Sequence, residues 1–237
     1  MNSSGTAQVI GDVYGISARN TGMGSTSISV NNVNSNLDRA IFADNISTTQ
    51  DLSIMADGTV TSQAEDGIFA RNQGSGDLTI TSSNAEGTAL VSGYQSGISA
   101  DNRNGGALSI TANSVYGEDN IAIYAVNDAA GTTLSVTTSG VIRATRRTSI
   151  IPDTTRDGLR ALHYGAGVVT VTATNAAGTA RGDGYDDGIY TLNEGSASTT
   201  IIANNASGVS NRGIYAINGV NTTGLSITAD GTVSSVN

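Results

Sequence analysis

One group of carboxylates in the chain is spaced in a way that could support chemistry on a substrate. Its members are Asp157, Asp183, Asp186 and Asp187. Arg160 and Arg212 would lie near these acids once the repeats stack, and acids beside an arginine could act on a polysaccharide, with calcium held by the carboxylates. The alternative is that the acids are polar turn residues, because another Asp-Gly pair begins at Asp66. We favour turn residues and expect no metal site.

The rest of the sequence offers little for catalysis. His163 is the single histidine, and the chain has no cysteine. A Ser-His-Asp set needs an accessible imidazole. His163 occupies the position that is asparagine in the related segments, and we expect that position to point inward. The sequence also has no Gly-Lys-Ser/Thr phosphate loop and no spaced His/Cys zinc ligands. We therefore predict no enzyme activity, no catalytic residue and no cofactor.

Five of the eleven arginines fall close together in an otherwise acidic chain. They are Arg143, Arg146, Arg147, Arg156 and Arg160. We expect residues 141–157 to form a protruding basic loop that could bind sulfated glycans or an acidic protein patch. The alternative is an excursion of the chain that pairs with local acids.

Arg181, Gly182 and Asp183 form an integrin-type tripeptide. Comparison of the similar segments that begin at Asn84 and Asn175 indicates five-residue insertions, one of them at 180–184. Insertions in repeat proteins map to surface loops. We therefore expect 180–184 to be an inserted loop that exposes the tripeptide.

All of these residues belong to a repeated unit. One six-residue phrase recurs eight times and consists of a small residue, an aliphatic residue, any residue, usually Ala, any residue and then Asn. Its aliphatic positions are Ile16, Ile41, Ile68, Ile98, Ile123, Leu159, Ile189 and Ile214. A second phrase follows, such as Leu108-Ser109-Ile110, and then a short third segment, such as Gly58-Thr59-Val60. Three short strands in about 25 residues predict an all-β fold, a right-handed parallel β-helix of about eight three-strand rungs. Residues 1–237 would form this single solenoid.

Alternation of side chains along a strand decides which residues face the core. In the first strand of a rung the aliphatic residue, Ala and Asn share one face, as do Ile68, Ala70 and Asn72. We expect this face to point inward. Stacked Asn amides could then form a hydrogen-bonded ladder along the axis, with His163 as a substitute for one Asn.

The outward positions of the same strand change character along the chain. In early rungs they alternate in charge, as Arg19, Asp44, Arg71 and Asp101 do, which predicts exposed ion pairs of small energy. In later rungs they become apolar, and we name this set the late-rung strip: Tyr124, Val126, Leu162, Tyr190, Leu192, Tyr215 and Ile217. We expect the strip to mediate self-association or host contact. The alternatives are a covering loop or simple β-propensity.

Composition narrows the classes of partner. The net charge is −9, which argues against nucleic acid and anionic membranes, since both require a basic surface. The absence of cysteine excludes a disulfide scaffold. The sequence has no apolar run long enough for a transmembrane helix. The chain begins and ends within repeats, so we expect a fragment of a longer protein.

The paired phrases Gly213-Ile214-Tyr215-Ala216-Ile217-Asn218 and Leu225-Ser226-Ile227-Thr228-Ala229 resemble the passenger domains of bacterial autotransporters, the type V secretion family. The resemblance covers nearly the whole chain. It implies a passenger at the bacterial cell surface or secreted, anchored to the outer membrane only through a C-terminal barrel outside this chain. Many members are adhesins or drive autoaggregation.

The resemblance therefore leads us to expect a non-enzymatic adhesin that binds a host cell-surface or matrix protein, a glycan or a second copy of itself. Phage tailspikes and polysaccharide lyases share the fold. A carbohydrate-active β-helix is accordingly one alternative, and a released passenger that engages a host receptor is another.

Overall fold

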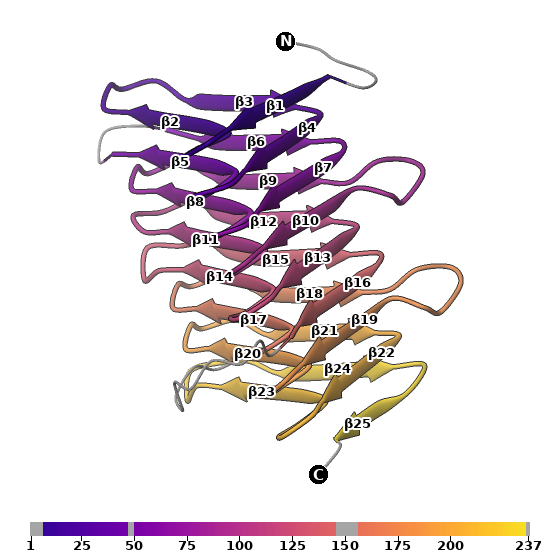
Figure 1. The fold of residues 1–237 in the computed structure, drawn as a ribbon. Helices are drawn as coiled ribbons and strands as arrows, with labels where there is room; N and C mark the ends of the chain where they lie inside the picture. Colours follow the sequence, from indigo (N-terminus) through magenta and orange to yellow (C-terminus); the bar gives the residue numbers. More distant parts are fainter. Residues whose placement is uncertain (1–6, 47–49, 146–155, 236–237) are drawn as a thin grey trace.

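Figure 1 shows a computed structural model of the chain, which describes residues 7–46, 50–145 and 156–235. All regular elements in these ranges are β-strands, which confirms the all-β prediction. None of these residues forms a helix long and apolar enough to cross a membrane.

The strands form three parallel sheets, and in each sheet the spatial order of the strands follows their order in the chain. Sheet A contains β1 (Gln8–Gly11), β4 (Asn32–Ser35), β7 (Thr59–Ser62), β10 (Leu90–Gly93), β13 (Ser114–Gly117), β16 (Val141–Ala144), β19 (Arg181–Gly184), β22 (Asn205–Gly208) and β25 (Val233–Ser235). Sheet B contains β2 (Ile16–Asn20), β5 (Ile41–Asn45), β8 (Ile68–Asn72), β11 (Ile98–Asn102), β14 (Ile123–Asn127), β17 (Leu159–His163), β20 (Ile189–Asn193) and β23 (Ile214–Asn218). Sheet C contains β3 (Thr26–Val30), β6 (Leu52–Ala56), β9 (Leu78–Ser82), β12 (Ala107–Ala112), β15 (Thr133–Thr138), β18 (Val169–Ala173), β21 (Thr199–Ala203) and β24 (Leu225–Ala229).

Successive strands enter sheets A, B and C in turn, and each strand pairs with the strand three places later. This order makes a parallel β-helix of about eight turns, as predicted, and Figure 1 shows the turns stacked into a rod. Adjacent turns should lie about 4.8 Å apart, the usual spacing between paired strands.

The core consists of rows of equivalent side chains from neighbouring turns. Ile98 pairs in register with Ile68 on one side and Ile123 on the other, and all three are completely buried. Leu108 and Ile110 form part of the corresponding rows on sheet C, also without exposed surface. The alternation predicted from the sequence is therefore confirmed.

The asparagine column is in register, but its hydrogen bonds differ from the predicted ladder. One amide-to-amide bond along the axis occurs, from Asn102 Nδ2 to Asn127 Oδ1 at 3.1 Å. Most amides instead donate to carbonyl groups of the turn that follows, as Asn193 does to Ala197 at 3.0 Å. The column thus closes the corner between sheets B and C, because each buried amide satisfies nearby backbone groups.

The inserted loop predicted at 180–184 is wrong in position. Residues 180–184 do not protrude, because Arg181–Gly184 is strand β19, paired with β16 and β22. The protruding turns lie just before strands β10 and β19, at 84–88 and 175–179, and Figure 1 shows both extending from the rod. In each turn the Asn side-chain oxygen accepts a hydrogen bond from a Thr backbone N–H at 2.9 Å, in the pairs Asn84–Thr88 and Asn175–Thr179.

The predicted basic loop at 141–157 also needs correction. Val141–Ala144 is strand β16 of sheet A, so the segment begins inside the rod. Arg156 and Asp157 at its other end are buried. Residues 146–155 lie outside the described part of the chain.

Candidate functional site

The late-rung strip lies on the outer face of sheet B, on strands β14, β17, β20 and β23. Register pairs its aliphatic members into one row, in the order Val126, Leu162, Leu192 and Ile217. Leu162 is buried, with 8% of its surface exposed, and the other three are half-buried. The strip is therefore contiguous, although Leu162 contributes less surface than expected.

The tyrosines of the strip form the second row, which contains an arginine. The order is Tyr124, Arg160, Tyr190 and Tyr215. The Arg160 guanidinium lies 4.5 Å from the Tyr190 ring centre, and that of Arg212 lies 3.7 Å from the Tyr215 ring centre. Such cation–π contacts hold the rings in place. The strip is thus an ordered apolar surface with guanidinium groups packed on it.

Early rungs of sheet B carry an ion-pair cluster rather than the predicted exposed pairs. Asp44 has only 3% of its side chain exposed. Arg71 binds it through two hydrogen bonds of 2.9 Å, and Arg19 lies 3.8 Å away. The hydrogen bonds from Arg71 lower the pKa of Asp44, so this carboxylate is charged.

Three of the acids that could do chemistry, Asp157, Asp186 and Asp187, are turn residues, whereas Asp183 lies in strand β19. Asp157 Oδ1 accepts the backbone N–H of Asp187 at 3.1 Å, and Asp187 Oδ1 accepts that of Arg212 at 3.0 Å. Burial raises the pKa of Asp157 to about 6 and also raises the pKa of Asp187. These acids therefore join successive rungs at the corner between sheets A and B. Among the described residues, no group of three or more His, Cys, Asp or Glu side chains could hold a metal ion.

The candidate basic residues that the structure describes do not form one exposed cluster. Arg156 has 5% of its side chain exposed and lies 3.8 Å from Asp119, while Arg160 pairs with Asp157 at 3.3 Å. Arg143 is on sheet A, 3.4 Å from Asp183. Arg146 and Arg147 lie outside the described residues. The described members are thus distributed over two faces and mostly paired.

The tripeptide Arg181, Gly182 and Asp183 is held within strand β19. Arg181 Nε lies 2.8 Å from Asp183 Oδ2, so the two charged side chains pair with each other. Gly182 faces the interior between Ile142 and Ala206 of the adjacent strands. This geometry does not provide the exposed loop expected from the sequence.

His163 occupies the asparagine column between Asn127 and Asn193 and is completely buried. Neither of its ring nitrogens makes a hydrogen bond of normal geometry with the described residues, although the Gly167 backbone makes a weak polar contact. Burial lowers its pKa from the ordinary 6.5. The neutral imidazole therefore belongs to the core of the solenoid.

We expect His163 to make the protein less stable as the pH falls below about 6.5. The unfolded chain then binds a proton that the folded chain does not, which costs up to about 1.4 kcal/mol per pH unit. His163→Asn restores the residue type of the column and should remove this part of the pH dependence. Urea unfolding of both proteins at pH 7.5 and 5.0 measures the difference. Equal losses of stability in the two proteins would contradict the prediction.

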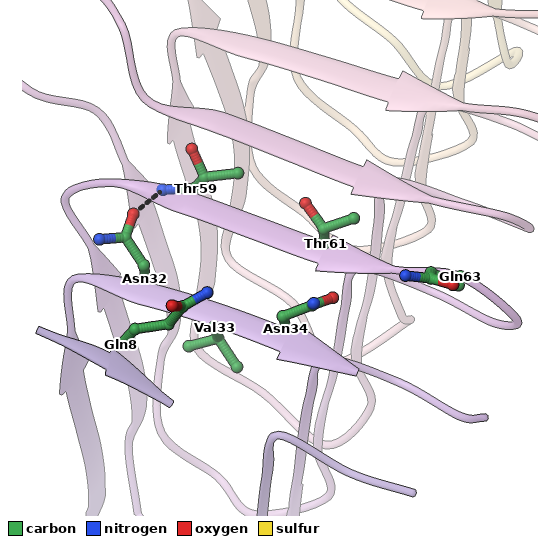
Figure 2. Close-up of a pocket in the computed structure, with 7 residues that line it drawn as sticks. All are labelled: Gln8, Asn32, Val33, Asn34, Thr59, Thr61 and Gln63. Carbon is green, nitrogen blue, oxygen red and sulfur yellow. Dashed lines mark hydrogen bonds between the residues drawn. The ribbon is translucent and has the colours of Figure 1, made fainter. Parts of the chain in front are cut away.

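Another surface, not singled out by the sequence, lies on the outer face of sheet A. A hollow of about 410 Å³ crosses β1, β4 and β7, and Figure 2 shows its lining of amide and hydroxyl side chains. The repeats give little signal for it, because its residue types differ from rung to rung.

No protein-family model, curated protein or solved structure matches the chain. The assignment of a function therefore depends on the surfaces described above.

Proposed function

We propose that this chain is a non-enzymatic adhesin-type rod that associates with a second copy of itself through the late-rung strip. The observation that supports this most directly is the four-strand row of apolar side chains facing outward from sheet B. Two features suit such a surface: the tyrosines are fixed by arginines, and aromatic and arginine residues are enriched at interfaces. Display at the bacterial surface or secretion, as the autotransporter resemblance implies, belongs to the same proposal.

The size of the strip determines how strong this association should be. Four strands at about 4.8 Å extend over roughly 14 Å along the rod. That area is small beside the approximately 800 Å² that each partner buries in a standard interface. We therefore expect weak, concentration-dependent association, which many displayed copies on a surface would reinforce.

Sedimentation velocity from low to high micromolar concentration tests this proposal. We expect the chain to dimerise at high concentration and the Tyr190→Ser, Tyr215→Ser variant to lose at least tenfold in affinity, because the variant removes two aromatic anchors. A matched control is Met55→Ser, Ile202→Ser, which removes exposed apolar side chains from sheet C instead. A monomer at every concentration, or equal loss in the control, would refute association through the strip.

A further inference from the structure

The outer face of sheet A is a polar groove with the features of a ligand site. The hollow in Figure 2 is lined mainly by amide and hydroxyl side chains, which can both donate and accept hydrogen bonds. They are Gln8, Asn32, Asn34, Thr59, Thr61 and Gln63. None of these six is charged, although the chain carries a net charge of −9. The lining is therefore a neutral patch on an acidic protein.

The polar side chains lie in rows along the rod. Gln8 pairs in register with Asn32, and Asn34 with Thr61, so polar side chains of different types follow one another at the rung spacing of about 4.8 Å. Asn32 is fixed by its own contact, because its Oδ1 accepts the backbone N–H of Thr59 at 2.8 Å. Asn34 Oδ1 is buried and accepts no hydrogen bond from the described residues, so this oxygen is not open to a ligand. The exposed polar side chains of the lining are Gln8, Thr59 and Gln63.

A second hollow continues the first. It has a volume of about 720 Å³ and shares Asn32 and Thr59 with the first hollow. The protruding turn at 84–88 forms its wall, through Asn84, Glu86 and Thr88 among others. A separate hollow of about 430 Å³ on the same sheet has the charged Glu118 and Arg143 in its lining. The first two hollows together form an open track across successive rungs rather than one closed pocket.

We infer that this groove binds an uncharged polysaccharide whose sugar units lie along successive rungs. Amide side chains can donate to one sugar hydroxyl and accept from its neighbour, and one pyranose ring is comparable in size with the rung spacing. An anionic glycan would be repelled by the net charge and by Glu86 and Asp57 of the second hollow. A protein partner would need apolar anchors, whereas Val33 is the sole aliphatic residue among those that line the first hollow.

The test is isothermal titration calorimetry of the whole chain with defined hexasaccharides. Maltohexaose, cellohexaose and laminarihexaose serve as neutral probes, and hexagalacturonate as the anionic probe. The variant Gln8→Ala, Gln63→Ala removes the two exposed amides of the lining and leaves the structural Asn32 in place. The matched control Ser109→Ala, Thr170→Ala changes the outer face of sheet C. Unfolding by urea checks that each variant folds as the parent does.

We expect at least one neutral hexasaccharide to bind, the groove variant to lose tenfold or more in affinity, and the sheet C control to retain it. Failure of all three neutral sugars to bind would overturn the inference, as would equal binding by the groove variant. Binding of hexagalacturonate alone would also overturn it. Sugar binding and self-association through the late-rung strip are measured in different experiments. The outcome of the sugar titrations therefore neither supports nor contradicts the proposed self-association.

Discussion

Gly93→Ala should lower the free energy of unfolding by about 3 kcal/mol or more, as expected for severe overpacking. Gly93 ends strand β10, and the chain reaches Gly97, just before the next strand, four residues later. A Cβ atom at Gly93 would overlap the backbone carbonyl oxygen of Ser96, three residues ahead. Because that obstacle is backbone, the turn cannot yield without moving the neighbouring rungs. Urea unfolding followed by circular dichroism measures the loss.

Other corners of the same kind show why this effect belongs to the turn. The equally short turns after Gly11 and Gly184 would place a Cβ against the same type of carbonyl oxygen. Ser62 occupies the equivalent position in a turn that is one residue longer. Its hydroxyl donates a hydrogen bond to the backbone carbonyl of Asp38 at 2.6 Å. Gly24→Ala is the control, since a Cβ there meets nothing within 4 Å. Equal stability of Gly93→Ala and Gly24→Ala would disprove the turn argument.

Arg71→Met should destabilise the protein by about 3 kcal/mol, because it leaves the buried Asp44 carboxylate without its main partner. Gln73 and Arg19 remain near Asp44, at 3.2 and 3.8 Å, and keep the loss at the lower end of the usual range. Measurement by urea unfolding at pH 7 gives the difference. Arg103→Met is the matched control: its pair with Asp101 is more exposed, with 47% and 22% of the two side chains accessible, and we expect a loss below about 1 kcal/mol.

The pH dependence separates this electrostatic cause from lost packing. Arg71 lowers the pKa of Asp44, so in the parent this pair stabilises the fold above the ordinary pKa of Asp and loses its effect at lower pH. Without Arg71, burial favours the neutral carboxyl. The gap between parent and Arg71→Met should therefore narrow as the pH falls from 7 toward 4. A gap that stays constant would indicate packing alone.

The sequence predicted the fold well because its signals are local and repeated. The recurring aliphatic–x–Ala–x–Asn phrase determines both the strand and its inward face, and register followed once identical phrases were stacked. The phrase containing Ile98 therefore predicted its neighbours Ile68 and Ile123 correctly. The recurring phrase was therefore enough to predict the number of rungs and the residues that face inward.

The loops were harder to predict for a physical reason. The insertion could be aligned either before or after the Gly-Thr-Ala segment, and only the Asn175–Thr179 hydrogen bond and the left-handed Gly178, with φ of 67°, show where the chain leaves the rod. Ion pairs across rungs, such as Arg71 with Asp44, join residues 27 apart, and their burial depends on side-chain packing. The sheet A groove has no repeated signature at all.

The stacking order also has a mechanical consequence. Hydrogen bonds between rungs run along the rod axis, so a pull on the two ends opens bonds one rung after another instead of shearing a whole sheet at once. A rung of 25 residues, such as that between Ile16 and Ile41, would release roughly 85 Å of extended chain. Under tension the rod would lengthen in successive steps of about that size, and the rungs not yet reached would stay folded.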